Sequence, residues 1–231
     1  MVSQFPRQSG DKVSQTQRVY ETLRQQILDW HLPPGTPLSE NDLSRQLGGS
    51  RTPVRQAIQQ LGHEGLVRIM PGRGAFVAEI SLSDIVELFE MRETLEVGAA
   101  CLACRAEDRE SLTALVPEFH AARESINGSD NSEYYALIRR FDQAIVDLCG
   151  NRRLAQALEE IWAQVRRLRH IAATDQARLL ETVDEHLGIL QAIVDGDETK
   201  AADQVRRHVR ASAQNILKNV TNRSGQRYIS V

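Results

Sequence analysis

Leu38–Val77 reads LSENDLSRQLGGSRTPVRQAIQQLGHEGLVRIMPGRGAFV, and it carries two helix starts followed by a hairpin. Ser39 and Ser50 each stand directly before an amphipathic run, which is the usual place of a helix-capping hydroxyl. Glycines break the chain between the two runs and again in the PGRG turn of the hairpin. With an amphipathic helix upstream, this order predicts a winged helix-turn-helix. The expected elements are helices over residues 16–30, 39–47 and 50–64 and strands over residues 66–70 and 75–80.

The helix expected after Ser50 begins with basic rather than acidic residues. Acidic side chains are favoured in the first turn because the exposed N–H groups carry partial positive charge there. Arg51 and Arg55 instead lie one turn apart, on the face opposite the apolar side chains. Arginines in this position bind guanine edges or phosphates, and Ser50, Thr52 and the first N–H groups can bind a further phosphate. The negative charge is therefore expected to come from DNA.

From residue 83 onward the pattern is helical with hardly a strand-like segment. The expected helices span residues 83–105, 108–126, 131–149, 151–173, 177–195 and 198–219. The predicted fold is therefore mostly α, with an N-terminal winged helix-turn-helix over residues 14–80 and an all-α antiparallel bundle of about six helices over residues 83–220. Residues 1–13 are expected to be a disordered tail and residues 221–231 a flexible one.

Charge is divided unevenly along the 231 residues, although the net charge of −3 does not indicate a protein that coats nucleic acid. Residues 1–78 hold nine Lys and Arg against six Asp and Glu, whereas residues 79–231 hold 19 against 25. Only the N-terminal part is therefore expected to meet a polyanion. Three cysteines do not form a disulfide framework, and the chain shows no signal peptide or membrane span. We expect a cytoplasmic protein without a membrane partner.

The stretch quoted above resembles the winged-helix domain of GntR-family transcriptional regulators. It matches the family pattern of a leucine-acid-leucine helix, SRTPVR, EGLV and a PxRG wing nearly throughout. The resemblance implies DNA contacts from Arg51, Thr52 and Arg55. It also implies a wing in which Gly74, beside Arg73, enters the minor groove.

The part beyond residue 83 resembles the FCD effector domain of the FadR branch of that family, in its six-helix, VanR-like subgroup. The resemblance rests on MRETLEVGAA, RRFDQAIVDLCGNRRL, EHLGILQAIVDGD and KAADQVRRHV, in this order. Many FCD domains bind a divalent metal through one aspartate and three histidines. Ile138 replaces that aspartate and Asp142 one histidine, whereas His186 and His208 match the others. The resemblance therefore implies a reduced set of Asp142, His186 and His208 for one Zn²⁺, Ni²⁺, Mn²⁺ or Fe²⁺ ion per chain.

Arg92 lies on the apolar stripe of the first bundle helix, which directs it inward. FCD relatives use inward arginines to bind acidic effectors, so the resemblance implies a carboxylate effector held by Arg92, Asp142, His186 and His208. Two alternatives stay open. Arg92 can form a structural salt bridge to Glu96 one turn on, and the histidines can be buried core residues bonded to Asp142 or to an organic anion.

These features together predict a ligand-responsive repressor that binds an inverted-repeat operator in double-stranded DNA as a homodimer. Its effector would be a small carboxylate bound in the bundle. The first alternative is a metal-dependent hydrolase that uses Asp142, His186 and His208. Because no general-base motif or nucleophile elbow is present, we expect no enzyme activity. The second alternative is an adaptor whose winged helix binds protein.

Overall fold

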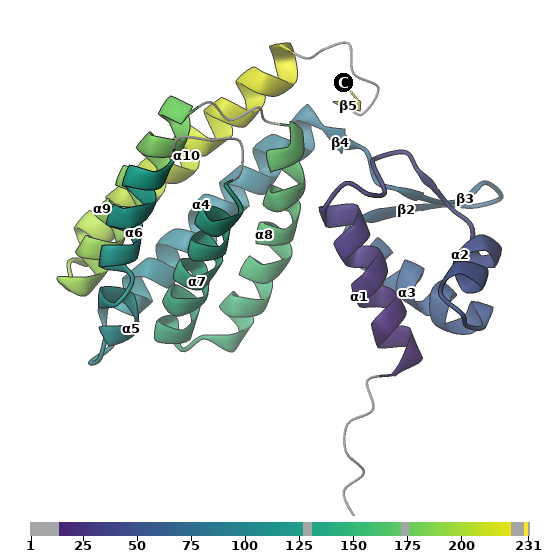
Figure 1. The fold of residues 1–231 in the computed structure, drawn as a ribbon, viewed down its shortest axis with the longest axis horizontal. Helices are drawn as coiled ribbons and strands as arrows, with labels where there is room; N and C mark the ends of the chain where they lie inside the picture. The colour runs from purple at the N-terminus through teal and green to yellow at the C-terminus, as the bar shows by residue number, and fades with distance from the viewer. Residues whose placement is uncertain (1–13, 127–130, 172–175, 223–228, 231) are drawn as a thin grey trace, which may run out of the picture. The chain divides into compact units, whose positions relative to one another are not determined.

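A computed structural model describes residues 14–126, 131–171, 176–222 and 229–230 (Figure 1). The chain divides into two compact units, with the boundary after Glu79. The first is a winged helix-turn-helix and the second is an all-α bundle, so the predicted fold class is confirmed. The disordered tail expected over residues 1–13 lies outside the described residues.

The N-terminal unit has three helices and a small antiparallel sheet. Its elements are α1 (Gln15–Leu28), β1 (Pro37–Leu38), α2 (Glu40–Gln46), α3 (Arg51–His63), β2 (Val67–Met70) and β3 (Gly74–Val77). The strand order is β1-β3-β2, with Val67 opposite Val77 and Met70 opposite Gly74. The sequence did not predict β1, because a strand of two residues carries no periodicity. The hairpin β2–β3 is the wing.

The core of this unit fixes the position of α3. α1 packs against α3, and α3 packs against α2 and β2. The buried side chains at these contacts include Leu23, Ile27, Val54, Ile58 and Leu61. Each contributes about 1.5–3 kcal/mol by leaving water. One face of α3 is therefore held in the core, and Arg51 and Arg55 lie on the opposite, exposed face.

The C-terminal unit is a bundle in which α4 is central. Its elements are β4 (Ile80–Ser81), α4 (Leu82–Cys104), α5 (Glu110–Thr113), α6 (Val116–Ser125), α7 (Ser132–Cys149), α8 (Arg152–Ile171), α9 (Gln176–Val194), α10 (Glu198–Asn222) and β5 (Ile229–Ser230). α4 starts at a capping box, in which Ser81 Oγ accepts from the Asp84 N–H and the Asp84 carboxylate accepts from the Ser81 N–H. It packs against α7, α8, α9 and α10.

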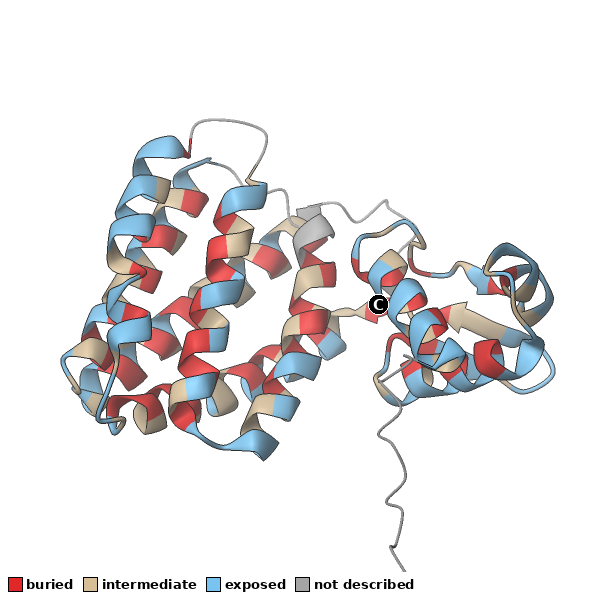
Figure 2. Cartoon of the chain, turned by 60° about the horizontal axis from the view of Figure 1, so that its bottom comes forward, coloured by how far each residue is buried: buried red, intermediate tan, exposed pale blue. Residues whose placement is uncertain are grey.

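Figure 2 shows the buried residues gathered on the inward faces of the bundle helices, as amphipathic helices require. Phe89, Phe119, Phe141 and Leu158 are among the buried apolar side chains. Polar side chains also enter this interior. Arg92, His186 and His208 are each at most 6% exposed.

The helix expected over residues 108–126 is two helices in the structure, α5 and α6. Pro117 lies at the second position of α6. Proline has no N–H to donate to the carbonyl of Thr113, and its ring clashes with that carbonyl. The helix therefore ends at Thr113, and a new one begins at Val116. The apolar spacing continues across Pro117, so the amphipathic pattern alone did not reveal this break.

The C-terminal segment expected as a flexible tail from residue 221 contains regular structure. α10 extends to Asn222, and β5 pairs in parallel with β4, Ile80 opposite Ile229. Residues 223–228 and 231 lie outside the described part. No described helix is apolar over enough length to cross a bilayer.

Candidate functional site

The first turn of α3 presents unoccupied hydrogen-bond donors beside basic side chains. Ser50 stands at the N-cap, but its side chain makes no capping hydrogen bond, and no acidic residue lies in the first turn. Arg51 and Thr52 are exposed beside it. By contrast, the N-cap Ser39 of α2 accepts a hydrogen bond from Asp42 in the usual way. The α3 N-terminus is therefore open to an external anion.

Arg55 lies one turn further along α3 and binds the Glu40 carboxylate of α2 through its Nε and Nη2 groups. The Arg55 Nε–Glu40 Oε1 distance is 2.9 Å, and the Arg55 Nη2–Glu40 Oε2 distance is 2.8 Å. The hydrogen bond from Arg55 and its charge hold the pKa of Glu40 below its ordinary value. The Arg55 side chain remains 59% exposed. The pair orients the guanidinium across the two helices. Sequence reasoning missed this pair because its partners are 15 residues apart.

The wing carries the remaining residues of the expected DNA surface. Arg73 is exposed in the turn between β2 and β3. Gly74 follows with a φ of +98° and no atom within 4 Å of an added Cβ. A residue with a side chain would be strained at this backbone angle even though space is available. The glycine therefore permits the turn, and because it has no side chain it keeps the tip of the wing narrow.

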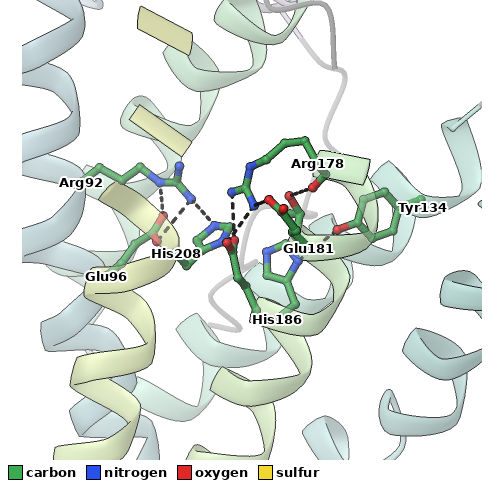
Figure 3. Close-up of polar contacts among 9 residues, drawn as sticks. Arg92, Glu96, Tyr134, Arg178, Glu181, His186 and His208 are labelled. Carbon is green, nitrogen blue, oxygen red and sulfur yellow. Dashed lines mark hydrogen bonds and ion pairs between the residues drawn. The ribbon is translucent and has the colours of Figure 1, made fainter. Parts of the chain in front are cut away.

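Inside the bundle, Arg92 of α4 bonds to two groups at once (Figure 3). Its Nε donates to Glu96 Oε1 at 2.7 Å, and its Nη2 lies 3.0 Å from His208 Nε2 of α10. Trp162 Nε1 of α8 donates to the same Glu96 oxygen at 2.7 Å. The alternative of a salt bridge between Arg92 and Glu96 is thus observed, and the arginine also points inward.

The polar contacts continue across His208 to α9. His208 Nδ1 lies 2.8 Å from Glu185 Oε2, and Arg178 binds the Glu185 carboxylate at 2.7 and 3.0 Å. We call Glu96, Arg92, His208, Glu185 and Arg178 the polar chain. It alternates carboxylates with cationic or imidazole groups and joins α4, α10 and α9.

In its neutral form, His208 has one tautomer that satisfies both of these contacts. The Arg92 guanidinium stays protonated and can only donate, so His208 Nε2 must accept. Nδ1 then carries the proton and donates to Glu185. Both ring nitrogens of His208 are therefore engaged within the protein.

Glu96 is ionised in this site despite its burial. Burial raises the pKa of this carboxyl, but the charge and hydrogen bond of Arg92, with smaller contributions from His208 and Trp162, lower it further than burial raises it. The net pKa is below its ordinary value. The side chains of Arg92 and Glu96 are only 7% and 13% exposed, so they form a buried ion pair.

His186 lies next to the polar chain. Its ring centroid is 4.6 Å from that of His208, and its Nδ1 is 3.2 Å from the Tyr134 hydroxyl of α7. Phe119 and Phe141 pack around the ring at centroid distances of 5.7 and 5.2 Å. His186 is therefore wedged between aromatic side chains on one side and the polar chain on the other.

A cavity of about 70 Å³ opens beside these groups. Its lining combines Arg92, His208 and Arg178 of the polar chain with hydroxyl and amide side chains from α7, α9 and α10. The lining includes Arg92, Tyr134, Tyr135, Ile138, Asp142, Arg178, Thr182, His186, His208, Ser212 and Asn215. A smaller cavity of about 20 Å³ adjoins it and is also lined by Arg92, Asp142, His186 and His208. All four residues expected to bind an effector therefore line the same space.

The metal site expected at Asp142, His186 and His208 is not shown by the structure. Among the described residues, no group of three or more His, Cys, Asp or Glu side chains is placed to hold a metal ion. The physical reason lies at His208, whose Nε2 faces a guanidinium and whose Nδ1 faces Glu185. Ile138, which stands where the resemblance implies an aspartate, is buried and supplies no donor. The residues present do not fit a bound divalent ion.

Sequence reasoning missed several side chains of this cavity. Arg178 lies two turns before His186 on α9, and Ser212 lies one turn after His208 on α10. Extending the histidine stripes by eight residues back from His186 and by four residues on from His208 would have found both positions. Glu185 had no such signal, because its neighbours at helical spacing do not reveal that it faces His208.

Comparisons with known proteins agree with both halves of this architecture. Residues 15–77 match the family model described as "Bacterial regulatory proteins, gntR family", and residues 87–211 match the FCD domain. The chain belongs to the GntR family and carries an FCD domain. The family resemblance drawn from the sequence is thereby confirmed.

Curated relatives span nearly the whole chain. An uncharacterized HTH-type transcriptional regulator in an unstable DNA locus of Streptomyces ambofaciens is 30% identical over 86% of this chain and 83% of its own length. The HTH-type transcriptional repressor RspR of Escherichia coli K12 is 28% identical over 88% of each chain. The solved structure of E. coli McbR/YncC has a TM-score of 0.73 at 24% identity, over 91% of this chain and 99% of its own, and shows the shared fold.

The family establishes the general function. The chain is a transcriptional regulator of the GntR type, whose winged helix binds DNA and whose FCD domain binds small-molecule effectors. The family and these relatives are regulators rather than enzymes, and nothing supports the hydrolase alternative.

Proposed function

We propose that this regulator is a repressor that binds an inverted-repeat operator as a homodimer and responds to a small carboxylate bound in its bundle. It would act in the cytoplasm, where the operator is. The observation that carries the sensing role is Arg92, a buried guanidinium on the wall of a polar cavity. A guanidinium at such a place is a strong partner for a carboxylate.

The DNA-binding surface that we propose consists of Ser50, Arg51, Thr52, Arg55, Arg73 and Gly74. The support comes from the open N-terminus of α3 and the exposed wing. In the free protein Glu40 holds Arg55 in place. Because both partners are partly exposed, DNA can displace Glu40 without uncovering a buried charge. Arg55 would then bind guanine or phosphate, and Ser50 with the first N–H groups of α3 would bind a phosphate.

The homodimer that we propose is supported by the exposed apolar surface of α4. Val86 is 44% exposed and Met91 is 53% exposed, which is unusual for large apolar side chains of a monomer's central helix. A second copy would cover them and place two α3 helices on the two halves of an inverted repeat. Sedimentation of the wild type and of Met91→Lys tests this. We expect a dimer for the wild type and a weakened dimer for the variant, and a monomeric wild type would contradict the proposal.

The test of the DNA surface uses an operator selected from random duplexes. Arg55→Ala should weaken binding to this operator roughly 5- to 150-fold, measured by fluorescence anisotropy at fixed salt. Arg206→Ala is the matched control, because it removes the same charge from an exposed ion pair on α10. Equal losses for the two variants would show that Arg55 contributes only through net charge.

The direction of regulation is tested by transcription in vitro. A promoter that contains the selected operator should yield less transcript when the protein is added, and an increase would identify an activator instead.

A further inference from the structure

The cavity beside Arg92 offers hydrogen-bonding groups that the protein does not use. Arg92 hydrogen bonds through Nε and Nη2, so within the described structure its Nη1 group makes no hydrogen bond. The side chain is nevertheless 7% exposed and lines the cavity. Ser212 lines the same cavity from α10 and makes no side-chain hydrogen bond to the described residues. Buried polar groups normally have partners, so an unused donor on a cavity wall points to a ligand.

These two groups lie near one another. His208 bonds to Arg92, and Ser212 follows His208 by four residues on the same face of α10. The Arg92 cation and the Ser212 hydroxyl, which lies one turn of α10 from the Arg92 partner His208, match a ligand whose carboxylate and hydroxyl are on neighbouring carbons. Tyr134, Thr182 and Asn215 add further polar groups to the lining.

The side chain of Arg92 supplies the positive charge of this site. Arg92 directs its Nη2 at His208 Nε2, the lone pair that a metal ion would need (Figure 3). A guanidinium does not lose its proton, so a change of pH does not remove the positive charge of Arg92 from the place that a metal ion would take. Glu96 and Trp162 hold it in place from the other side.

We propose that this site binds a small hydroxycarboxylate without a metal ion, with Arg92 Nη1 on the carboxylate and Ser212 on an adjacent hydroxyl. Arg92 thus replaces the metal as the source of positive charge. The inference rests on the proposed sensing function and names its ligand class. A cavity of about 70 Å³ holds roughly five water molecules, so the ligand has a short carbon chain.

The experiment is calorimetric titration of the full chain after treatment with a chelator. The probes are the four-carbon acids threonate and erythronate, each in both enantiomers. Butyrate, which lacks the hydroxyls, and threitol, which lacks the charge, are the matched controls. We expect at least one hydroxy acid to bind at least tenfold more tightly than either control. Added Zn²⁺ or Ni²⁺ should leave that affinity unchanged.

Two variants assign the roles. Ser212→Ala should weaken binding of the hydroxy acid about tenfold and leave butyrate binding unchanged. Arg92→Gln combined with Glu96→Gln removes both members of the ion pair and should abolish binding. Circular dichroism of both variants checks that the bundle is folded, and Ser212→Ala alone keeps the test valid if the double variant does not fold.

Several results would overturn the inference. They are binding that requires added metal, butyrate binding as tightly as the hydroxy acids, or no binding of any probe at 10 mM, a concentration far above a useful sensing range. Operator binding is measured on the same preparation. A protein that binds operator but no hydroxy acid refutes this inference alone, whereas one that binds the acid but no DNA refutes the proposed function.

Discussion

Glu96→Ala tests whether the polar chain is a buried charge pair that holds the bundle together. The change leaves Arg92, with its side chain 7% exposed, without a counter-charge, and it removes the acceptor of Trp162 Nε1. Removing one partner of a buried ion pair costs about 3–5 kcal/mol because the other charge stays uncompensated. We expect the free energy of unfolding to fall by that amount, a large part of the stability of an ordinary domain.

Urea unfolding measures this loss. The chain has two tryptophans, Trp30 in the N-terminal unit and Trp162 in the bundle. Trp30→Phe as the background therefore makes Trp162 fluorescence a reporter of the bundle alone. With a slope of about 2 kcal/mol per molar urea, the midpoint should fall by about 1.5–2.5 M. Protein concentration is kept constant because dimerisation would shift the midpoint.

Two further variants separate the charge from the packing. Glu96→Gln keeps an acceptor for Trp162 and should lose less stability than Glu96→Ala. Arg92→Met combined with Glu96→Met removes both charges and should recover most of the loss, because no buried charge is left unpaired. A loss below about 1 kcal/mol for Glu96→Ala would refute the view that Glu96 compensates Arg92.

Three other predictions concern pH, backbone strain and thiol chemistry. The pKa of Glu96 is lowered in the folded protein, so the stabilising effect of its charge is complete above the ordinary pKa of 4.5 and is lost as pH falls through the folded-state pKa. The difference in unfolding free energy between wild type and Glu96→Gln, measured by urea titration, should therefore be largest at pH 7 and should narrow below pH 4.5. Gly150 ends α7 at a φ of +63°, with no atom within 4 Å of an added Cβ. Gly150→Ala should therefore lower the free energy of unfolding by about 1–2 kcal/mol through backbone strain alone. An unchanged midpoint of urea unfolding would contradict this. Burial raises the pKa of the Cys104 thiol to about 11, so an aromatic disulfide reagent at pH 8 should label Cys104 only after denaturation. Rapid labelling of Cys104 itself in the folded protein, located by peptide mapping, would refute its burial, whereas labelling of the less buried Cys101 would not.

Much of the fold could be predicted because its signals are local. Ser39 and the apolar repeats placed the helices of the winged helix, and the PGRG turn placed its hairpin. Pro117 shows the limit of such reading. Its effect depends on one carbonyl four residues back, and the apolar pattern continues on both sides of the break.

The sequence predicted which residues lie together in the candidate site, but not the hydrogen bonds between them. Arg92, Asp142, His186 and His208 do line one cavity, as the helical stripes and the family resemblance indicated. The sequence does not show which group faces His208 Nε2, and that contact is what argues against the metal set. Arg92 is 116 residues from His208 along the chain, so only the folded chain brings them within 3.0 Å.

The sequence by itself determined the two-part architecture, the basic start of the DNA-reading helix and the family, because capping, turn chemistry and helical periodicity act over a few residues. The tertiary structure alone decided what the bundle can bind. The polar chain joins residues from α4, α9 and α10, and their burial determines which atoms remain available. In a low-dielectric interior each carboxylate and guanidinium must find a partner, and within the described part of the chain those pairings engage both ring nitrogens of His208 and leave Arg92 Nη1 and the Ser212 hydroxyl without a hydrogen bond.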